Sequence, residues 1–303
     1  MADALIGKNG WLYLCNDTNG CLEQYQGLRT FAESDLRYYC RVLEKRRAIY
    51  AALGIPYIFV VAPNKETIYP ENLPDGLQKD PDGTPYERLL AYTADHSDFE
   101  IVDLRKDLRN EKERARIYHR HDTHWNHLGA YSAYRTIMET IEDYLPGVRV
   151  RSLDEFRLKV QEWKTPDLLT KQKMILVDGK FVLHPDPPDV GAGDADIFIS
   201  PKGRQARKRS GDPHLNVSKT RPAFVFENED SGLPRVLLFR DSFSTRIMHF
   251  LAESFQRLAC VWKPNPVFAL TAIEKPDIVL HVMIERFLIA LPEDPAVSWP
   301  APA

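Results

Sequence analysis

Residues 119–129 hold the densest group of reactive side chains in the sequence. The segment reads His-Arg-His-Asp-Thr-His-Trp-Asn-His-Leu-Gly and contains four of the nine histidines, with Asp122 among them. Histidine beside a carboxylate serves nucleophilic catalysis, where the imidazole acts as a base, and it also serves metal coordination. Residues elsewhere in the chain have to distinguish between these two chemistries.

A second reactive segment lies far downstream, around Ser242. The apolar run 235–239 predicts a strand, Arg240, Asp241 and Ser242 follow it, and residues 245–257 are expected to form a helix. A serine between a strand and a helix presents its hydroxyl at the carboxyl edge of a sheet, where the first N–H groups of the helix can stabilise an oxyanion. The alternative is that Ser242 only caps the helix.

Asp122 and His124 can complete a catalytic triad with Ser242. Their two-residue spacing lets the carboxylate reach Nδ1 of the imidazole within one turn, which fixes the tautomer that leaves Nε2 free as a base. The residues therefore predict Ser242 as nucleophile, His124 as general base and acid, and Asp122 as the orienting carboxylate.

The competing hypothesis is a zinc or iron site in the same segment. Its ligand-bearing residues are His119, His121, Asp122, His124 and His127. The spacing only loosely resembles the His-x-His-x-Asp-His of metallo-β-lactamases, since Asp122 falls one position early, and no clear ligand set follows. A third interpretation places His119, His121 and His127 on the surface with no role in chemistry.

Strands and helices alternate along most of the chain. Strands are expected at residues 10–14, 55–62, 99–104, 235–239, 258–262 and 277–284, and helices at 34–53, 87–94, 126–144, 245–257 and 266–274. Such alternation predicts a mostly parallel sheet with helices on both faces. The run 55–62 is apolar throughout, as in strands buried on both faces, and Asn64 and Lys65 follow its carboxyl end, where open α/β sheets place ligands.

The pattern weakens between residues 147 and 233, where we expect an inserted β-rich subdomain or cap within a single domain spanning residues 1–303. Residues 174–177 and 180–183, separated by Asp178-Gly179, predict a hairpin with a type I′ turn. The basic run 202–209 is typical of a solvated loop, although it could also contact an anionic polymer.

The composition excludes several classes of protein. A net charge of −3 and an isoelectric point near 6.3 argue against a nucleic-acid binder, and no apolar run is long enough for a transmembrane helix. The first eight residues lack the apolar core of a signal peptide, so either the protein is cytosolic or the sequence begins after a removed leader. Cys15 and Cys21 flank a turn that could bring them together as a disulfide, and the alternative is four free thiols.

Five motifs, in order along nearly the whole chain, resemble the alginate O-acetyltransferase family of AlgX/AlgJ-like SGNH hydrolases. They are G-x-x-G-W-L-(F/Y)-L at 7–14, V-x-P-x-K-x-x-I-Y-P at 61–70, D-x-H-W-(N/T)-x-x-G at 122–129, (G/R)-D-S-F at 240–243 and E-R at 285–286. The histidine block precedes the serine block, as in these permuted domains. Arg240 stands where ordinary esterases of this kind have glycine, which weakens a plain esterase interpretation.

The resemblance implies a three-layer α/β/α, flavodoxin-like SGNH fold and an O-acetyltransferase with an acetyl-serine intermediate. Its acceptor would be an exopolysaccharide hydroxyl in the periplasm, and water in place of the sugar would make it an acetylesterase. A membrane O-acyltransferase would supply the acetyl donor, and no cofactor is implied. The residues expected to bind substrate or the oxyanion are Arg240, Asn64, Lys65 and Trp125.

Two other functions stay open at this point. One is a metal-dependent hydrolase that uses the histidines of residues 119–127. The other is a non-catalytic carbohydrate-binding protein on an inactive SGNH scaffold.

Overall fold

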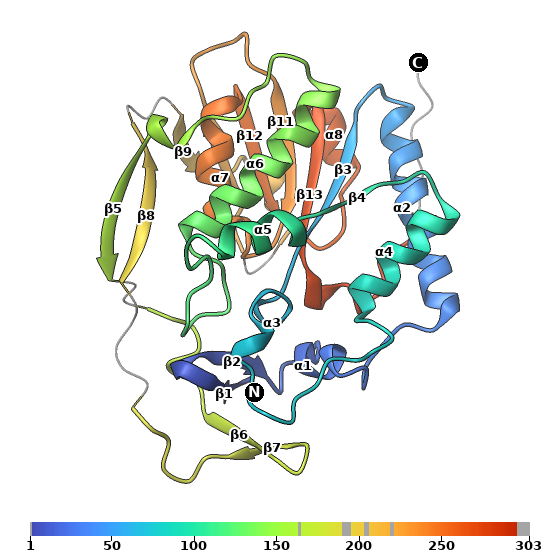
Figure 1. Ribbon diagram of the computed structural model, residues 1–303. Helices are drawn as coiled ribbons and strands as arrows, with labels where there is room; N and C mark the ends of the chain where they lie inside the picture. Colours follow the sequence, from blue (N-terminus) through green and yellow to red (C-terminus); the bar gives the residue numbers. More distant parts are fainter. Residues whose placement is uncertain (1, 163–164, 190–194, 203–205, 219–220, 296–303) are drawn as a thin grey trace.

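The computed structural model describes residues 2–162, 165–189, 195–202, 206–218 and 221–295 (Figure 1). A seven-stranded sheet lies at the centre, in the order β4-β3-β13-β11-β12-β10-β9. Its first five strands are parallel: β4 (Ile101–Asp103), β3 (Tyr57–Ala62), β13 (Ile278–Ile284), β11 (Arg235–Arg240) and β12 (Arg257–Trp262). Two antiparallel strands extend one edge: β10 (Phe224–Glu227) and β9 (Arg207–Ser210).

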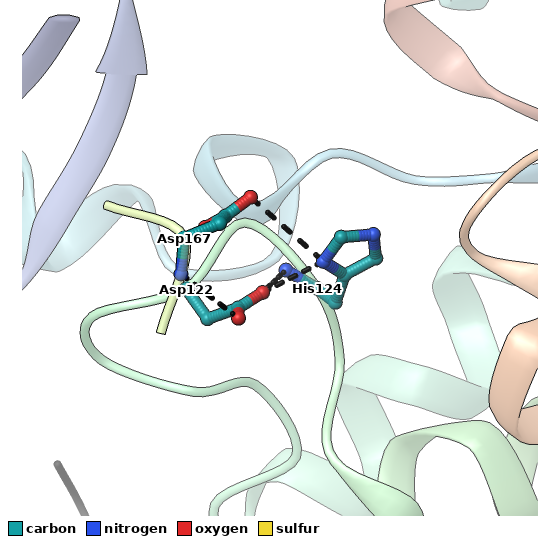
Figure 2. A group of neighbouring side chains, drawn as sticks. All are labelled: Asp122, His124 and Asp167. Atoms are coloured by element: carbon teal, nitrogen blue, oxygen red, sulfur yellow. Dashed lines mark hydrogen bonds and ion pairs between the residues drawn. The ribbon is translucent and has the colours of Figure 1, made fainter. Parts of the chain in front are cut away.

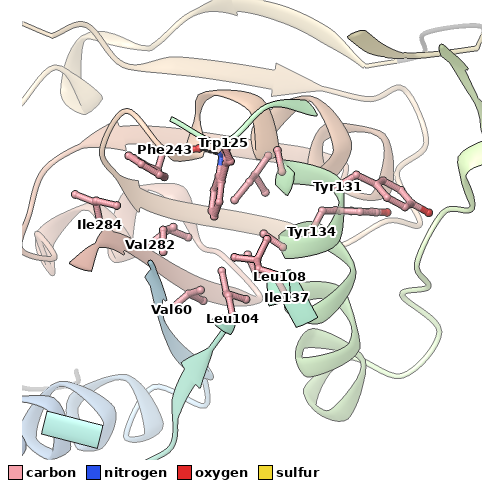
Figure 3. Close-up of a cluster of buried hydrophobic side chains, with 14 of the residues drawn as sticks. Val60, Leu104, Leu108, Trp125, Tyr131, Tyr134, Ile137, Phe243, Val282 and Ile284 are labelled. Carbon is pink, nitrogen blue, oxygen red and sulfur yellow. Dashed lines mark hydrogen bonds between the residues drawn. The ribbon is translucent and has the colours of Figure 1, made fainter. Parts of the chain in front are cut away.

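Helices cover both faces of this sheet. The first face carries α5 (Arg105–Lys112), α6 (His127–Tyr144) and α7 (Ser244–Leu251), and the second carries α2 (Glu33–Ala51), α4 (Pro85–His96) and α8 (Ala269–Glu274). Side chains along each strand alternate between the two cores, so Val60 packs with the first helix layer while Phe59 packs with the second. Figure 3 shows Val60 and Val282 of the sheet in one buried cluster with Ile137 of α6. The expected three-layer α/β/α architecture is confirmed.

Smaller elements lie outside the central sheet and its main helices. They are the strands β1 (Asp3–Ile6), β2 (Leu12–Cys15), β5 (Phe156–Glu162), β6 (Lys173–Val177), β7 (Lys180–Leu183) and β8 (Ala195–Pro201), and the short helices α1 (Cys21–Tyr25) and α3 (Lys65–Ile68). Turns of 3-10 helix occur at Lys8–Gly10, Pro70–Asn72, Leu153–Glu155, Pro213–Leu215, Ala252–Ser254 and Glu285–Phe287.

The strands between residues 147 and 233 do not share one sheet. β6 and β7 extend the sheet of β1 and β2, β5 pairs with β8, and β9 and β10 belong to the central sheet. The predicted hairpin is confirmed, with Asp178 and Gly179 at φ of 48° and 76°, as a type I′ turn requires. The segment is therefore built into three parts of the molecule rather than folded as a separate layer.

Several helices differ from the sequence-based expectation. α5 was not anticipated, because Leu108 is its only buried residue and a single apolar position gives no helical period. The helix expected to reach residue 257 ends at Leu251, since Arg257 begins β12 and pairs with Arg235 of β11. The predicted polar loop after β3 instead contains the helical turn α3.

All four cysteines are buried free thiols, so the alternative of a Cys15–Cys21 disulfide is wrong for this structure. The Cys21 thiol donates to the carbonyl of Leu14 at 2.9 Å. Burial, with help from nearby carboxylates, raises the pKa of Cys15 to about 12, which makes its thiol unreactive.

In the described part of the chain, every helix is too short or too polar to cross a bilayer.

Candidate active site

The carboxyl ends of three neighbouring parallel strands bring Asn64, Ser242 and Glu285 to one edge of the sheet. Asn64 follows β3, Ser242 follows β11 and Glu285 follows β13, which lies between the other two. The register pairs Ile284 with Ala62 and Arg240 with Val282, so these strands end at nearly the same level. The site lies at the edge expected for an open α/β sheet.

Asp122 and His124 form a directly bonded pair (Figure 2). Oδ1 of Asp122 lies 2.7 Å from Nδ1 of His124 and also accepts the His124 backbone N–H at 3.0 Å. Burial acts to raise the pKa of Asp122, but the hydrogen bonds and charge of His124 outweigh it and hold that pKa well below its usual range. An ionised Asp122 fixes the proton of the imidazole on Nδ1, which leaves Nε2 unprotonated as a base.

A tight loop between Tyr118 and Trp125 presents this pair. The two residues form a β-bridge, and the His119 N–H donates to the carbonyl of His124 at 3.2 Å. Asn126 then begins α6 as its N-cap, with Oδ1 accepting the N–H groups of Leu128 and Gly129. His124 is therefore held between a closed loop and a helix start.

Lys65 supports the same loop from below. Its ammonium group donates to three main-chain carbonyls, those of His119 at 3.3 Å, Arg120 at 3.0 Å and Asp122 at 2.8 Å. The side chain is buried. The expectation that Lys65 binds substrate or the oxyanion is corrected, because its ammonium N–H groups donate to the carbonyls of the loop.

Trp125 joins the histidine loop to the serine turn. Its indole Nε1 donates to the carbonyl of Phe243 at 3.0 Å, and the Phe243 ring lies 4.8 Å from the imidazole of His124, centroid to centroid. Trp125 has 0% of its surface exposed and packs in the core with Tyr134 (Figure 3). Stacking of Trp125 on a sugar ring is therefore wrong, since no face of the ring is accessible.

Ser242 lies in the turn between β11 and α7 and is half-buried. The turn is braced by Asp241, whose carboxylate accepts the N–H groups of Phe243 at 2.8 Å and Ile284 at 2.6 Å. The Ser242 side chain does not cap α7, and its hydroxyl makes no hydrogen bond to any residue that the structure describes, His124 included. The serine and histidine segments are neighbours through Phe243, and the hydroxyl is left available.

Arg240 and Asn64 are the other two residues expected to bind substrate. The Arg240 guanidinium is buried over the Trp262 ring, 4.8 Å from its centroid, and lines a cavity of about 480 Å³. Burial lowers the pKa of Arg240. The Asn64 N–H donates to Glu285 at 2.8 Å, and its side chain borders a water-sized cavity that Thr123 also lines.

The other histidines of the loop do not gather around His124. His119 and His121 are buried, so the surface interpretation of these two is wrong: Nε2 of His119 lies 3.1 Å from Arg246, and Nε2 of His121 lies 3.0 Å from the carbonyl of Gly10. The His127 ring lies 4.8 Å from the Phe198 ring, centroid to centroid, with the two planes tilted by 45°. Among the described residues, the ligand atoms of Asp122, His124 and Asp167 lie within 4.8 Å of one another, whereas no group of three such atoms includes His119, His121 or His127, so the multi-histidine ligand set expected from the sequence is not assembled.

Two buried carboxyl groups lie close to this edge, and sequence reasoning gave neither of them a place in the site. Glu285 accepts the Thr67 hydroxyl at 2.7 Å, and Glu66 is fully buried beside it. Burial, and next the charge of Glu285, raise the pKa of Glu66 to about 8. Motif matching marked the segments of both residues but gave no sign that either would be buried.

Replacing Glu66 with glutamine should remove part of the loss of stability at alkaline pH. The pKa of Glu66 is higher in the folded protein than in the unfolded chain, so protonation of Glu66 stabilises the fold. This stabilisation is fully present below about pH 4, declines as pH rises and is lost above pH 8. Between pH 6 and 9 this costs the wild type up to about 3 kcal/mol, which the neutral amide avoids. Urea unfolding at both pH values measures it, with the exposed Glu100→Gln as the matched control. Equal pH slopes for wild type and Glu66→Gln would contradict it.

Comparison with known proteins identifies the fold. The family model described as "SGNH hydrolase-like domain, acetyltransferase AlgX" matches residues 4–176, more than half of the chain. PatB1 of Bacillus cereus superposes with a TM-score of 0.65 at 15% identity, over 95% of this chain and 97% of PatB1. The O-acetyltransferase domain of Pseudomonas putida AlgJ gives 0.60 at 15% identity, over 98% and 96%.

AlgX of Pseudomonas aeruginosa is more distant, with a TM-score of 0.51 at 15% identity over 93% of this chain and 61% of AlgX. No curated protein matches the chain. At these identities the structures show a shared fold, and the SGNH hydrolase-like architecture is confirmed.

Proposed function

Because the chain belongs to the family of SGNH hydrolase-like domains of the AlgX acetyltransferase type, we propose that it carries an acetyl group on Ser242 and transfers it to a hydroxyl of an exopolysaccharide. The observation that supports this most strongly is the bond of 2.7 Å between the buried Asp122 and the partly exposed His124, in a loop tied to the Ser242 turn by the Trp125–Phe243 hydrogen bond. An acetyl transfer of this kind is consistent with the acetyltransferase family to which the matched model belongs.

In the first half-reaction, Oγ of Ser242 attacks the acetyl carbonyl of the donor while Nε2 of His124 takes the serine proton. Asp122 stays ionised and stabilises the imidazolium through Nδ1. The imidazolium then protonates the departing donor group, and the acetyl group remains as an ester on Ser242. The hydroxyl, which has no partner in the described structure, would bond to Nε2 as the substrate complex forms.

In the second half-reaction, Nε2 of His124 takes the proton of a sugar hydroxyl, whose oxygen attacks the acetyl-serine. The ester bond to Ser242 breaks, and the serine oxygen recovers the proton from the imidazolium. Water in place of the sugar gives acetate, so the same site has esterase activity.

An oxyanion forms in both steps and needs hydrogen-bond donors. The Phe243 N–H is already committed to Asp241. Of the four residues expected to bind substrate or the oxyanion, we retain Asn64 in that role, because its side-chain amide makes no hydrogen bond to the described residues and borders a small cavity that Thr123 also lines. Lys65 borders the same cavity, but its ammonium is occupied by the loop carbonyls. Arg240 is retained for the acceptor, because it lines the larger cavity.

The family also suggests the setting of the reaction. We place it in the periplasm, with a polysaccharide as acceptor and a membrane O-acyltransferase as the source of the acetyl donor. These three assignments rest on the family resemblance alone.

Incubation of the protein with p-nitrophenyl acetate should leave an acetyl adduct on the peptide that contains Ser242, with p-nitrophenol released at the same rate in EDTA. Peptide mass spectrometry and absorbance measure the two quantities. Release that is lost in EDTA and restored by zinc, without an adduct, would instead indicate a metal-dependent hydrolase. Glycan binding without turnover of any acyl donor would indicate a non-catalytic scaffold.

A further inference from the structure

A second carboxylate, that of Asp167, lies beside the Asp122–His124 pair (Figure 2). Its Oδ2 lies 4.0 Å from Nδ1 of His124 and accepts the hydroxyl of Thr123 at 2.7 Å, while its Oδ1 accepts the Thr123 N–H at 2.8 Å. The imidazole nitrogen that faces Asp122 therefore also faces Asp167.

Thr123 connects the second carboxylate to the imidazole. Its Oγ1 lies 3.2 Å from Nδ1 of His124. Because the hydroxyl proton is donated to Asp167, an oxygen lone pair is left to face the N–H of the imidazole. Negative charge at Asp167 polarises this hydroxyl, so it favours a proton on Nδ1 and positive charge on the ring.

The backbone around Asp167 is fixed on the histidine loop. The Asp167 N–H donates to Oδ2 of Asp122 at 3.2 Å, and the Leu168 N–H donates to the carbonyl of His121 at 3.1 Å. Leu168 is fully buried and packs with Ala4 and Leu12. The carboxylate itself keeps 39% of its side-chain surface exposed, so core packing does not account for its position.

Among the described residues, charged and titratable groups approach His124 and its loop from several segments. Asp122 and Asp167 face Nδ1, Asp241 lies in the serine turn, and the Arg286 guanidinium lies 5.6 Å from the centroid of the Phe243 ring. On the loop itself, the Lys65 ammonium donates to the carbonyl of Asp122, and His119 adds positive charge near the Asp122 carboxylate. Asp122 and Asp167 approach Nδ1 directly, whereas the Arg286 guanidinium lies over the Phe243 ring, which packs against the imidazole. Asp167 is thus the second-nearest negative group to the imidazole among the described residues.

We propose that Asp167 is a positioning residue for the proposed acetyl transfer. Through Thr123, the Asp167 carboxylate holds the Nδ1 proton of His124 toward Asp122. It also stabilises the imidazolium that forms when Ser242 loses its proton. Asp167 takes no proton in either half-reaction. The inference rests on the proposed function for its catalytic consequence, but its electrostatic consequence for His124 does not depend on turnover.

Asp167→Asn tests this directly. Loss of the charge makes the imidazolium less favourable, so the acidic limb of the kcat/KM profile for p-nitrophenyl acetate should move to lower pH by about half a unit. The plateau of kcat/KM should fall about tenfold, with KM little changed. Thr123→Val removes only the connecting hydroxyl and should give a smaller change in the same direction. Asp186→Asn, an exposed aspartate between β7 and β8, is the matched control and should behave as wild type.

An NMR titration of the His124 ring in wild type and Asp167→Asn separates the two possible failures. A titration midpoint that moves to lower pH supports the role of Asp167 even if Ser242 proves not to be acetylated, in which case only the proposed function fails. A midpoint and a rate profile that both match wild type would overturn the inference. If Asp167→Asn does not fold, Thr123→Val provides the same two readouts.

Discussion

Ser242→Ala should lower kcat/KM for p-nitrophenyl acetate by about 10⁴-fold or more and abolish the acetyl adduct. Without the hydroxyl no covalent intermediate can form, and the remaining turnover comes only from water activated at His124. The free energy of unfolding should change by less than about 0.5 kcal/mol, because the hydroxyl makes no hydrogen bond to the described residues. Initial rates, peptide mass spectrometry and urea unfolding measure the three quantities.

Ser244→Ala is the matched control for this substitution. Ser244 begins α7 two residues later, is fully buried and has a hydroxyl without a partner in the described structure. It should retain wild-type activity, since its side chain cannot reach a substrate. Wild-type turnover in Ser242→Ala would remove the serine from the chemistry and end the proposed mechanism.

Asp122→Asn should reduce kcat/KM by about 10⁴-fold while the protein remains folded. The Asp122 carboxylate accepts both N–H groups of His124 through Oδ1 and the N–H of Asp167 through Oδ2. An amide has one oxygen, so its NH₂ group must face a donor on one side. When the NH₂ group faces His124, it favours the imidazole tautomer that is protonated on Nε2. That tautomer cannot accept the serine proton.

The same substitution should cost about 1–3 kcal/mol of stability at pH 7, because one donor loses its acceptor. The lowered native pKa of Asp122 means that its stabilisation is present above about pH 4 and is lost as pH falls toward the native pKa. The difference in free energy of unfolding between Asp122→Asn and wild type, measured by urea unfolding, should therefore become smaller below pH 4. The exposed Asp95→Asn is the control, and wild-type activity in Asp122→Asn would exclude Asp122 as the orienting carboxylate.

The sequence by itself determined the features that depend on short stretches of chain. The alternation of apolar strands with amphipathic helices predicted the layered sheet, and the position of Ser242 after an apolar run placed it at the carboxyl edge. The Asp122–His124 contact could be anticipated because an aspartate side chain readily bonds the groups of a residue two positions on within a turn. The five motifs indicated the family from the sequence because each is a short local pattern.

Only the tertiary structure decided what each polar side chain contacts. Lys65 and Trp125 carry groups that suit a substrate, yet one holds three carbonyls of the histidine loop and the other is sealed in the core. Asp167 lies 45 positions after Asp122, in a stretch without a clear pattern, and reaches His124 only through the fold. Local sequence limits backbone angles and apolar faces, whereas a buried donor or acceptor is satisfied by whichever distant segment packs against it.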